Sequence, residues 1–152
     1  MSEAPTVLTE LKLTPQMQEA VNSAFGMRRP MVIAYVDPNG LPRQSYRGST
    51  QAYSETQLAI WVRNPQSGIL TAIAQNPAVS MVFGYFKPDD RGFMIFGGRA
   101  RIDESEAVRD QVYGNAHEFE RSQDPDRRGK ALVIDLDSVD GFFGGAALQM
   151  RG

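Results

Sequence analysis

Two closely spaced Asn-Pro pairs constrain the fold of this chain more than any other feature of its sequence. Between Trp61 and Val82 the sequence reads WVRNPQSGILTAIAQNPAVSMV. The residue before a proline disfavours helical geometry, so we expect a strand to end at Asn64-Pro65 and a new strand to begin after Asn76-Pro77. The stretch between the two breaks predicts a short helix of roughly residues 67–75. This region therefore reads as strand, short helix and strand in direct succession.

Polar side chains gather at the first break, where the short helix begins: Arg63, Asn64, Gln66 and Ser67. A helix N-terminus presents unpaired N–H groups and a partial positive charge, which suit a phosphate. Arg63 at the strand end could add a bidentate contact to the same phosphate. The simpler interpretation is an ordinary strand–turn–helix in which Ser67 caps the helix. The local pattern alone favours that interpretation, because capped helices are far commoner than phosphate sites.

The rest of the chain predicts short strands joined by tight turns. Thr14-Pro15 opens a first helix, since threonine is a good cap and proline suits the first helical position. The turn Asp37 to Gly40 joins two strands, and Gly97-Gly98 predicts a bulge or a close approach inside another. We expect one long helical segment from Asp103 to Ser122 and assign no regular element to the tail from Ser138 onwards. The expected strands are residues 30–36, 41–50, 57–63, 78–86, 93–102 and 130–136.

Composition limits the class of protein. Six short strands with peripheral helices predict a mainly β fold, a small antiparallel barrel, and 152 residues correspond to one domain. The absence of cysteine excludes disulfides and thiol chemistry, and a net charge of −2 gives no reason to expect a nucleic-acid partner. No apolar run is long enough to span a membrane, and the N-terminus lacks the order of a signal peptide. We therefore expect a cytoplasmic protein.

The sequence contains no set of residues that would be catalytic without a cofactor. The single histidine, His117, falls on a predicted peripheral helix among charged residues, where a solvated side chain is the expected case. The acidic pairs Asp89-Asp90 and Asp135/Asp137 have no partner base, so a metal or glycosidase site is not expected. No glycine-rich phosphate loop follows the first strand. No catalytic residue is assigned.

A cluster around Arg47 fits a phosphorylated cofactor better. Arg47 lies near the end of a strand that is adjacent to the strand ending at Arg63, so the two arginines together with Ser67 could neutralise a dianionic phosphate. The small residues beside Arg47 leave backbone groups open to a planar ring, and two residues of the next strand could wall that ring. These are Gly48, Ser49, Thr50, Trp61 and Val62. The alternative for Arg47 is a solvent-facing strand residue.

From Pro30 to Ile102 the order of elements resembles a known family. The order runs strand, DPNGLPR, strand with Arg47, strand, RNPQS, helix, QNPAVSMVF and a glycine-containing strand. This order is similar to that of the pyridoxamine 5′-phosphate oxidase-like flavin-binding split barrels. The resemblance implies a six-stranded antiparallel split β-barrel over residues 1–152 as a single FMN-binding domain. It also implies a homodimer with FMN at the interface.

The resemblance assigns roles to individual residues. It implies that Arg47 and Ser67 contact the FMN phosphate, with Arg63 and Asn64 beside it, and that Gln66 lies at the same turn. Residues near Gly48 to Thr50 and Trp61-Val62 would line the isoalloxazine ring and the ribityl chain. The residues expected to bind the cofactor are thus Arg47, Gly48, Ser49, Thr50, Trp61, Val62, Arg63, Asn64, Gln66 and Ser67.

The chain departs from the family in two places. The basic pair that commonly follows the family's serine is replaced by Gly68 and Ile69, although Arg63 could compensate for the lost charge. The end of the chain, GFFGGAALQMRG, lacks the Trp-, Arg- and His-bearing segment that grips the pyridoxal substrate in the true oxidases. Authentic pyridoxamine phosphate oxidase activity is therefore not expected.

Three functions stay open at this point. The first is an FMN-dependent oxidoreductase acting on an unidentified small-molecule substrate, with the redox chemistry supplied by the flavin. The second is a related barrel using the deazaflavin F420, to which Arg28-Arg29 could contribute a broader basic groove. The third is a non-catalytic flavin-binding module or a barrel without a cofactor, which the Gly68-Ile69 departure favours. The haem-degrading relatives of this fold are a remoter option, because the chain has so little histidine.

Overall fold

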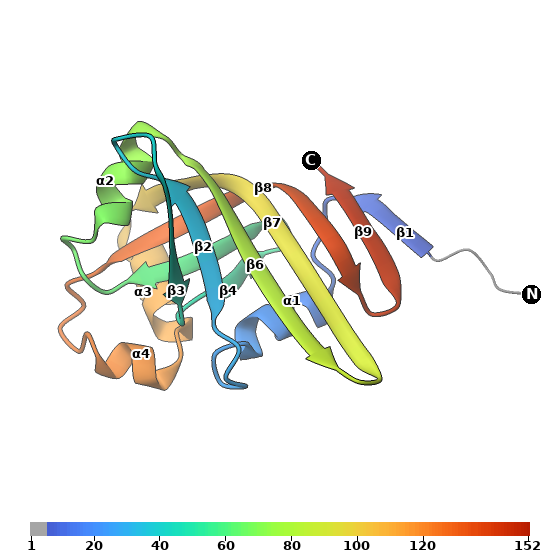
Figure 1. Ribbon diagram of the computed structural model, residues 1–152. Helices are drawn as coiled ribbons and strands as arrows, with labels where there is room; N and C mark the ends of the chain where they lie inside the picture. The colour runs from blue at the N-terminus through green and yellow to red at the C-terminus, as the bar shows by residue number, and fades with distance from the viewer. Residues whose placement is uncertain (1–5) are drawn as a thin grey trace, which may run out of the picture.

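The computed structural model describes residues 6–152 and is built mainly from strands that belong to one large sheet (Figure 1). Four helices lie around this sheet. The elements are β1 Thr6–Glu10, α1 Pro15–Ser23, β2 Met31–Val36, β3 Pro42–Arg47, β4 Gln51–Ser54, β5 Gln57–Val62, α2 Gly68–Gln75, β6 Ala78–Lys87, β7 Asp90–Asp103, α3 Glu106–Asn115, α4 Glu118–Ser122, β8 Lys130–Phe143 and β9 Ala146–Arg151.

The sheet curls into a split barrel. Its strand order is β3-β2-β6-β7-β8, and β8 then pairs with β5 along its first half and with β9 along its second half. The predicted strand 41–50 is interrupted after Arg47, so that β3 pairs with β2 whereas β4 pairs with β5. Counting β3 and β4 as one bent strand gives the six antiparallel barrel strands that we predicted. Within residues 6–152 no ladder joins β3 to β5, so the barrel stays open at this side.

The tail from Ser138 onwards is regular structure, although the sequence pattern assigned it none. It forms the second half of β8 and the strand β9, joined by a tight turn at Gly144-Gly145, where both residues have positive φ angles of 60° and 79°. At the other end of the chain β1 pairs with β9 in parallel. In Figure 1 this pair extends the sheet at the end away from α3 and α4, and the C-terminus lies there.

Glycines allow two close approaches between β7 and β8. The predicted bulge at Gly97-Gly98 is confirmed, because the β7–β8 register shifts between these two residues. A Cβ atom at Gly98 would collide with the carbonyl oxygen of Asp135, and one at Gly141 would collide with that of Phe93. Gly141 also has a φ angle of 140°, which side-chain-bearing residues rarely adopt. Both close pairings therefore depend on the absence of a side chain.

We expect Gly141→Ala to lower the free energy of unfolding by about 2 kcal/mol, because it combines an unfavourable φ angle with a backbone clash. Urea unfolding followed by circular dichroism measures this loss. Gly68→Ala is the matched control, since the added methyl group at the start of α2 would meet no atom within 4 Å outside Gly68, its chain neighbours and the adjoining helix backbone. Equal stabilities of the two variants would contradict the close approach of β7 and β8 at Gly141.

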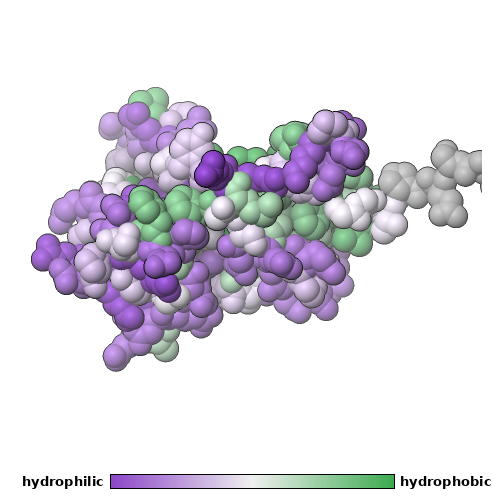
Figure 2. Space-filling model, turned by 90° about the horizontal axis from the view of Figure 1, so that it is seen from below, coloured by the Kyte–Doolittle hydropathy of each residue, from purple (hydrophilic) through white to green (hydrophobic). Residues whose placement is uncertain are grey.

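Helices α1, α3 and α4 lie below the sheet, whereas α2 lies at its upper left (Figure 1). Thr14 caps α1 as predicted, with its hydroxyl accepting a 3.2 Å hydrogen bond from Met17 N, and Met17 and Val21 point into the core. The predicted helical segment 103–122 is divided into α3 and α4, which are separated at Ala116-His117. Seen from below, the face that carries α1, α3 and α4 is largely hydrophilic with apolar patches between (Figure 2). The division of the segment matters because it aims one residue of α4 into the candidate site.

Candidate cofactor site

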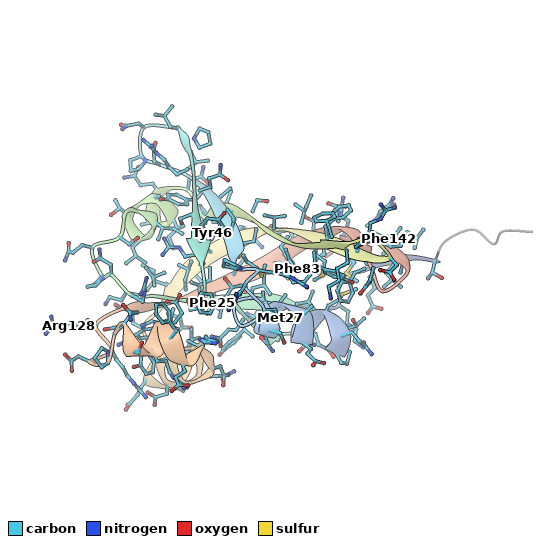
Figure 3. The ribbon with its side chains drawn as sticks, turned by 60° about the horizontal axis from the view of Figure 1, so that its bottom comes forward. Phe25, Met27, Tyr46, Phe83, Arg128 and Phe142 are labelled. Atoms are coloured by element: carbon cyan, nitrogen blue, oxygen red, sulfur yellow. The ribbon has the colours of Figure 1, made fainter. Side chains whose placement is uncertain are left out.

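A pocket of about 300 Å³ lies where β3 bends into β4, beside the end of β5 and against α4. It brings together six of the ten residues that the sequence assigned to a cofactor, and three that it did not. The predicted ones are Arg47, Gly48, Ser49, Trp61, Arg63 and Asn64, and the others are Tyr46, Glu120 and Gln123. Figure 3 shows Tyr46 and Phe25 at this end of the molecule, near α3 and α4, with Phe142 far away along the sheet.

Arg47 is one of three residues with a buried side-chain polar atom that lacks a hydrogen-bond partner in the part of the chain that the structure describes, and of the three it alone lines this pocket. It stands opposite the buried Met31 on β2, so its side chain points inward from the edge strand β3. Its Nε atom is buried and has no hydrogen-bond partner among the described residues. Burial lowers the pKa of the Arg47 guanidinium, Arg63 lowers it further, and Tyr35 and Glu120 act in the opposite direction. A buried N–H group of a cation that lacks an acceptor is costly, so an anion at this position would be stabilised.

Arg63 supplies the second positive charge and is paired with a residue of α4. Its Nε lies 3.2 Å from Glu120 Oε2, with 43% of the Arg63 side chain exposed but only 10% of that of Glu120. The other carboxylate oxygen, Oε1, occupies the space next to Gly48 together with the ring of Phe25. Glu120 and Phe25 therefore fill the side of Gly48 where a Cβ atom would stand, so the space that we predicted for a planar ring is occupied on that side, although Gly48 still lines the pocket.

Ser49 and Thr50 fix the bend between β3 and β4. The Ser49 hydroxyl donates to the carbonyl of Trp61 and accepts from the N–H of Trp61, both at 2.9 Å. The Thr50 hydroxyl donates to the carbonyl of Arg47 at 2.7 Å. Both hydroxyls are thus engaged by the protein backbone, and they hold the end of β3 in place relative to β5.

Trp61 and Val62 do not form the open wall that the sequence suggested. Val62 is fully buried in the barrel core. Trp61 borders the pocket, but its ring packs edge-on against Tyr113 at 5.2 Å, and its Nε1 donates a 2.9 Å hydrogen bond to Asp124. The alternation of strand residues explains the difference, because neighbours on β5 point to opposite faces, and both faces are covered here.

Of the turn before α2, residues 64–67, only Asn64 lines the pocket. Asn64 Oδ1 accepts a 2.9 Å hydrogen bond from Gln66 N, which forms the turn. Gln66 is exposed and Ser67 is half-buried, and neither residue lines the pocket. Ser67 occupies the N-cap position, but its side chain makes no capping hydrogen bond within the described part of the chain. The interpretation of Ser67 as an ordinary helix cap is therefore not supported.

His117 has a structural role at the start of α4. Its Nδ1 accepts a 3.1 Å hydrogen bond from Phe119 N, and its ring packs edge-on against Phe25 at 4.8 Å. Within residues 6–152, no group of three or more His, Asp or Glu side chains is placed to hold a metal ion. The same residues contain no helix long and apolar enough to cross a membrane.

Comparison with known proteins identifies the family. The family model described as pyridoxamine 5′-phosphate oxidase matches residues 13–141. The chain belongs to this family, and its fold is the FMN-binding type of split barrel. Comparison with curated protein sequences gave no match.

Solved structures share this fold at low sequence identity. HupZ from Group A Streptococcus has a TM-score of 0.63 and 16% identity, covering 88% of this chain and 97% of its own. An FMN-binding protein from Syntrophomonas wolfei has a TM-score of 0.65 and 7% identity, with 84% and 87% covered. A putative pyridoxamine 5′-phosphate oxidase from Lactobacillus delbrueckii has a TM-score of 0.59 and 18% identity, with 87% and 96% covered.

Proposed function

We propose that this chain is an FMN-binding flavoprotein and an oxidoreductase of the pyridoxamine 5′-phosphate oxidase-like class, with the FMN phosphate bound between Arg47 and Arg63. The buried Nε of Arg47, which has no partner in residues 6–152, carries this proposal. A phosphate oxygen would supply the missing acceptor, and charge-assisted hydrogen bonds of this kind are the strong ones. When bound, FMN would supply the hydride chemistry at its ring.

The residues present fit the phosphate end of such a group. Arg47 and Arg63 provide positive charge, and the amide of Asn64 provides a further polar group at the pocket wall. The pocket volume of about 300 Å³ is at the lower end for small-molecule sites, so one chain encloses a part of the cofactor. A partner chain beside the pocket would enclose the rest.

The outer face of the sheet supports a homodimer. One continuous row of residues, called here the outer row, crosses four neighbouring strands. It consists of Tyr46 on β3, Val32 on β2, Val82 on β6 and Ile95 on β7, each paired with the next across the sheet. Tyr46 is 74% exposed, Val82 43% and Ile95 44%. Contiguous apolar residues of this kind are typical of an interface. Because Tyr46 also lines the pocket, a second copy packed on the outer row would lie next to the cofactor site.

We expect Val82→Glu to convert the dimer into a monomer, because it buries a charge at the centre of the outer row without a partner. Light scattering at micromolar concentration measures the mass. Leu41→Glu is the control, since Leu41 is similarly exposed at the tip of the β2–β3 hairpin and lies outside the outer row. A wild-type protein that is monomeric under these conditions would refute the dimer and the shared site.

Binding of flavin is tested by equilibrium titration of the purified protein with FMN and, separately, with riboflavin, which lacks the phosphate. Quenching of flavin fluorescence reports binding. We expect saturable binding of FMN and weaker binding of riboflavin. A folded dimer that binds neither flavin would overturn the proposal.

The structure favours FMN over F420 at this site. The broader basic groove would need Arg28 and Arg29, but neither lines the pocket. The guanidinium of Arg29 lies instead over the ring of Tyr85, at 5.1 Å from its centroid. Mass spectrometry of a cofactor released from the protein distinguishes the two compounds directly.

A further inference from the structure

The pocket proposed for the FMN phosphate already contains a negatively charged side chain. Glu120 reaches into it from α4, with one carboxylate oxygen 3.2 Å from Arg63 Nε and the other packed beside Gly48. Glu120 is almost fully buried, and it also interacts electrostatically with Arg47. Two arginines and one carboxylate leave the pocket with a net charge of about +1. That charge is insufficient to neutralise a dianionic phosphate.

We propose that Glu120 sets how tightly this site binds a flavin that carries a phosphate. Its carboxylate competes with the cofactor phosphate for Arg63, so the bound FMN is an exchangeable ligand. The inference rests on the proposed function, because it concerns the same site. Two anions that share one arginine repel each other in a partly buried pocket, where charges are weakly screened. Phosphate binding therefore requires the Glu120 side chain to leave Arg63 or to remain beside the phosphate at a cost in affinity.

The backbone that carries Glu120 is held in place. The Tyr113 hydroxyl lies 3.2 Å from the carbonyl oxygen of Arg121 and 3.0 Å from that of Asp124, and it can donate to either. The guanidinium of Arg121 donates to the carbonyl of Gly114 at 2.8 Å, which ties α4 to the end of α3. When phosphate binds, the Glu120 carboxylate then leaves Arg63 by rotation of its side chain, and α4 itself does not move.

The test removes the negative charge of Glu120 and keeps the shape of its side chain. Glu120→Gln retains an oxygen that can accept from Arg63 but removes the negative charge. We expect this variant to bind FMN about tenfold more tightly than the wild type, and to bind riboflavin with unchanged affinity, because only FMN carries the phosphate. In a desalting experiment the variant retains FMN for longer than the wild-type protein does.

Glu118→Gln is the matched control. Glu118 lies on the same helix but is exposed, so its replacement removes one negative charge from the protein surface and leaves the pocket unchanged. We expect FMN affinity within about twofold of the wild type, since surface charges are strongly screened. An equal gain in both variants would show a general charge effect and would overturn the inference. Equal or weaker FMN binding by Glu120→Gln would also overturn it, because Glu120 would then serve to position Arg63.

Inorganic phosphate separates this inference from the proposed function. If neither protein binds FMN, the proposed function fails, and the effect of phosphate on the thermal denaturation midpoint tests Glu120 independently. A larger phosphate-dependent rise in Glu120→Gln than in the wild type supports the competing carboxylate. The same rise in both proteins contradicts it.

Discussion

Replacement of Arg47 by alanine is expected to weaken FMN binding by about 100-fold, because it removes a half-buried cation that would bind the phosphate directly. Riboflavin binding is expected to change far less, since riboflavin has no phosphate. Fluorescence titration of both flavins with the wild type and Arg47→Ala measures the difference. Arg47→Lys keeps the charge but loses the Nε donor, and it should give an intermediate affinity.

Arg43→Ala controls for the loss of an arginine from the same strand. Arg43 lies on β3, but its Nε donates to Asp37 at 2.8 Å in the β2–β3 turn, and its side chain is 56% exposed. It does not line the pocket. We expect unchanged FMN affinity in this variant. Loss of FMN binding in Arg43→Ala and not in Arg47→Ala would place the phosphate elsewhere on β3.

Asp124→Ala is expected to lower the free energy of unfolding by about 3 kcal/mol, the largest loss of stability that we predict for a single polar side chain. The buried carboxylate of Asp124 accepts three hydrogen bonds of 2.9 Å, from Trp61 Nε1, Arg128 N and Gly129 N. Its removal leaves three donors without an acceptor and frees the loop that precedes β8. Urea unfolding followed by Trp61 fluorescence and by circular dichroism measures the change.

The neighbouring Asp126 provides the control. It is exposed and lies 4.0 Å from Arg128, the limit for an ion pair. Asp126→Ala should change the free energy of unfolding by no more than about 0.5 kcal/mol. A similar loss in both variants would mean that the hydrogen bonds of Asp124 are not its source of stability.

The same carboxylate makes stability depend on pH. Burial raises the pKa of Asp124, but hydrogen bonds from Arg128, Gly129 and Trp61 outweigh burial, so the folded-state pKa is below its usual value. A depressed pKa means that the contribution is fully present above the unfolded-state value of about 3.9 and is lost as pH falls through the folded-state value. The destabilisation caused by Asp124→Ala should therefore shrink below about pH 4.

The strands of the barrel were predictable because their signals are local. Hairpin turns such as Asp37 to Gly40 and the breaks at Asn64-Pro65 and Asn76-Pro77 mark where strands end, and the paired glycines mark the bulge in β7. The pairing of β1 with β9 was not predictable, because it joins residues near the two ends of the chain. The tail also contains Phe142-Phe143 followed by two glycines, a pattern without strand periodicity.

The two arginines were correctly expected to be near each other, but for a reason that is partly wrong. We expected β3 and β5 to be adjacent, whereas β3 reaches the end of β5 by bending into β4. Glu120 was missed because it stands within a segment that reads as one long helix. The division at Ala116-His117 redirects α4 towards the pocket, and the apolar spacing of that segment does not reveal it.

A crystal structure of the protein with bound FMN would give the distance from Arg47 Nε to the nearest phosphate oxygen, and this distance is the sharpest test of the proposed phosphate site. We expect a hydrogen bond of about 2.8 Å, with the phosphate between Arg47 and Arg63 and with Glu120 rotated away from Arg63. A flavin bound at another place, with Arg47 Nε still unpaired and the Arg63–Glu120 ion pair intact, would contradict it.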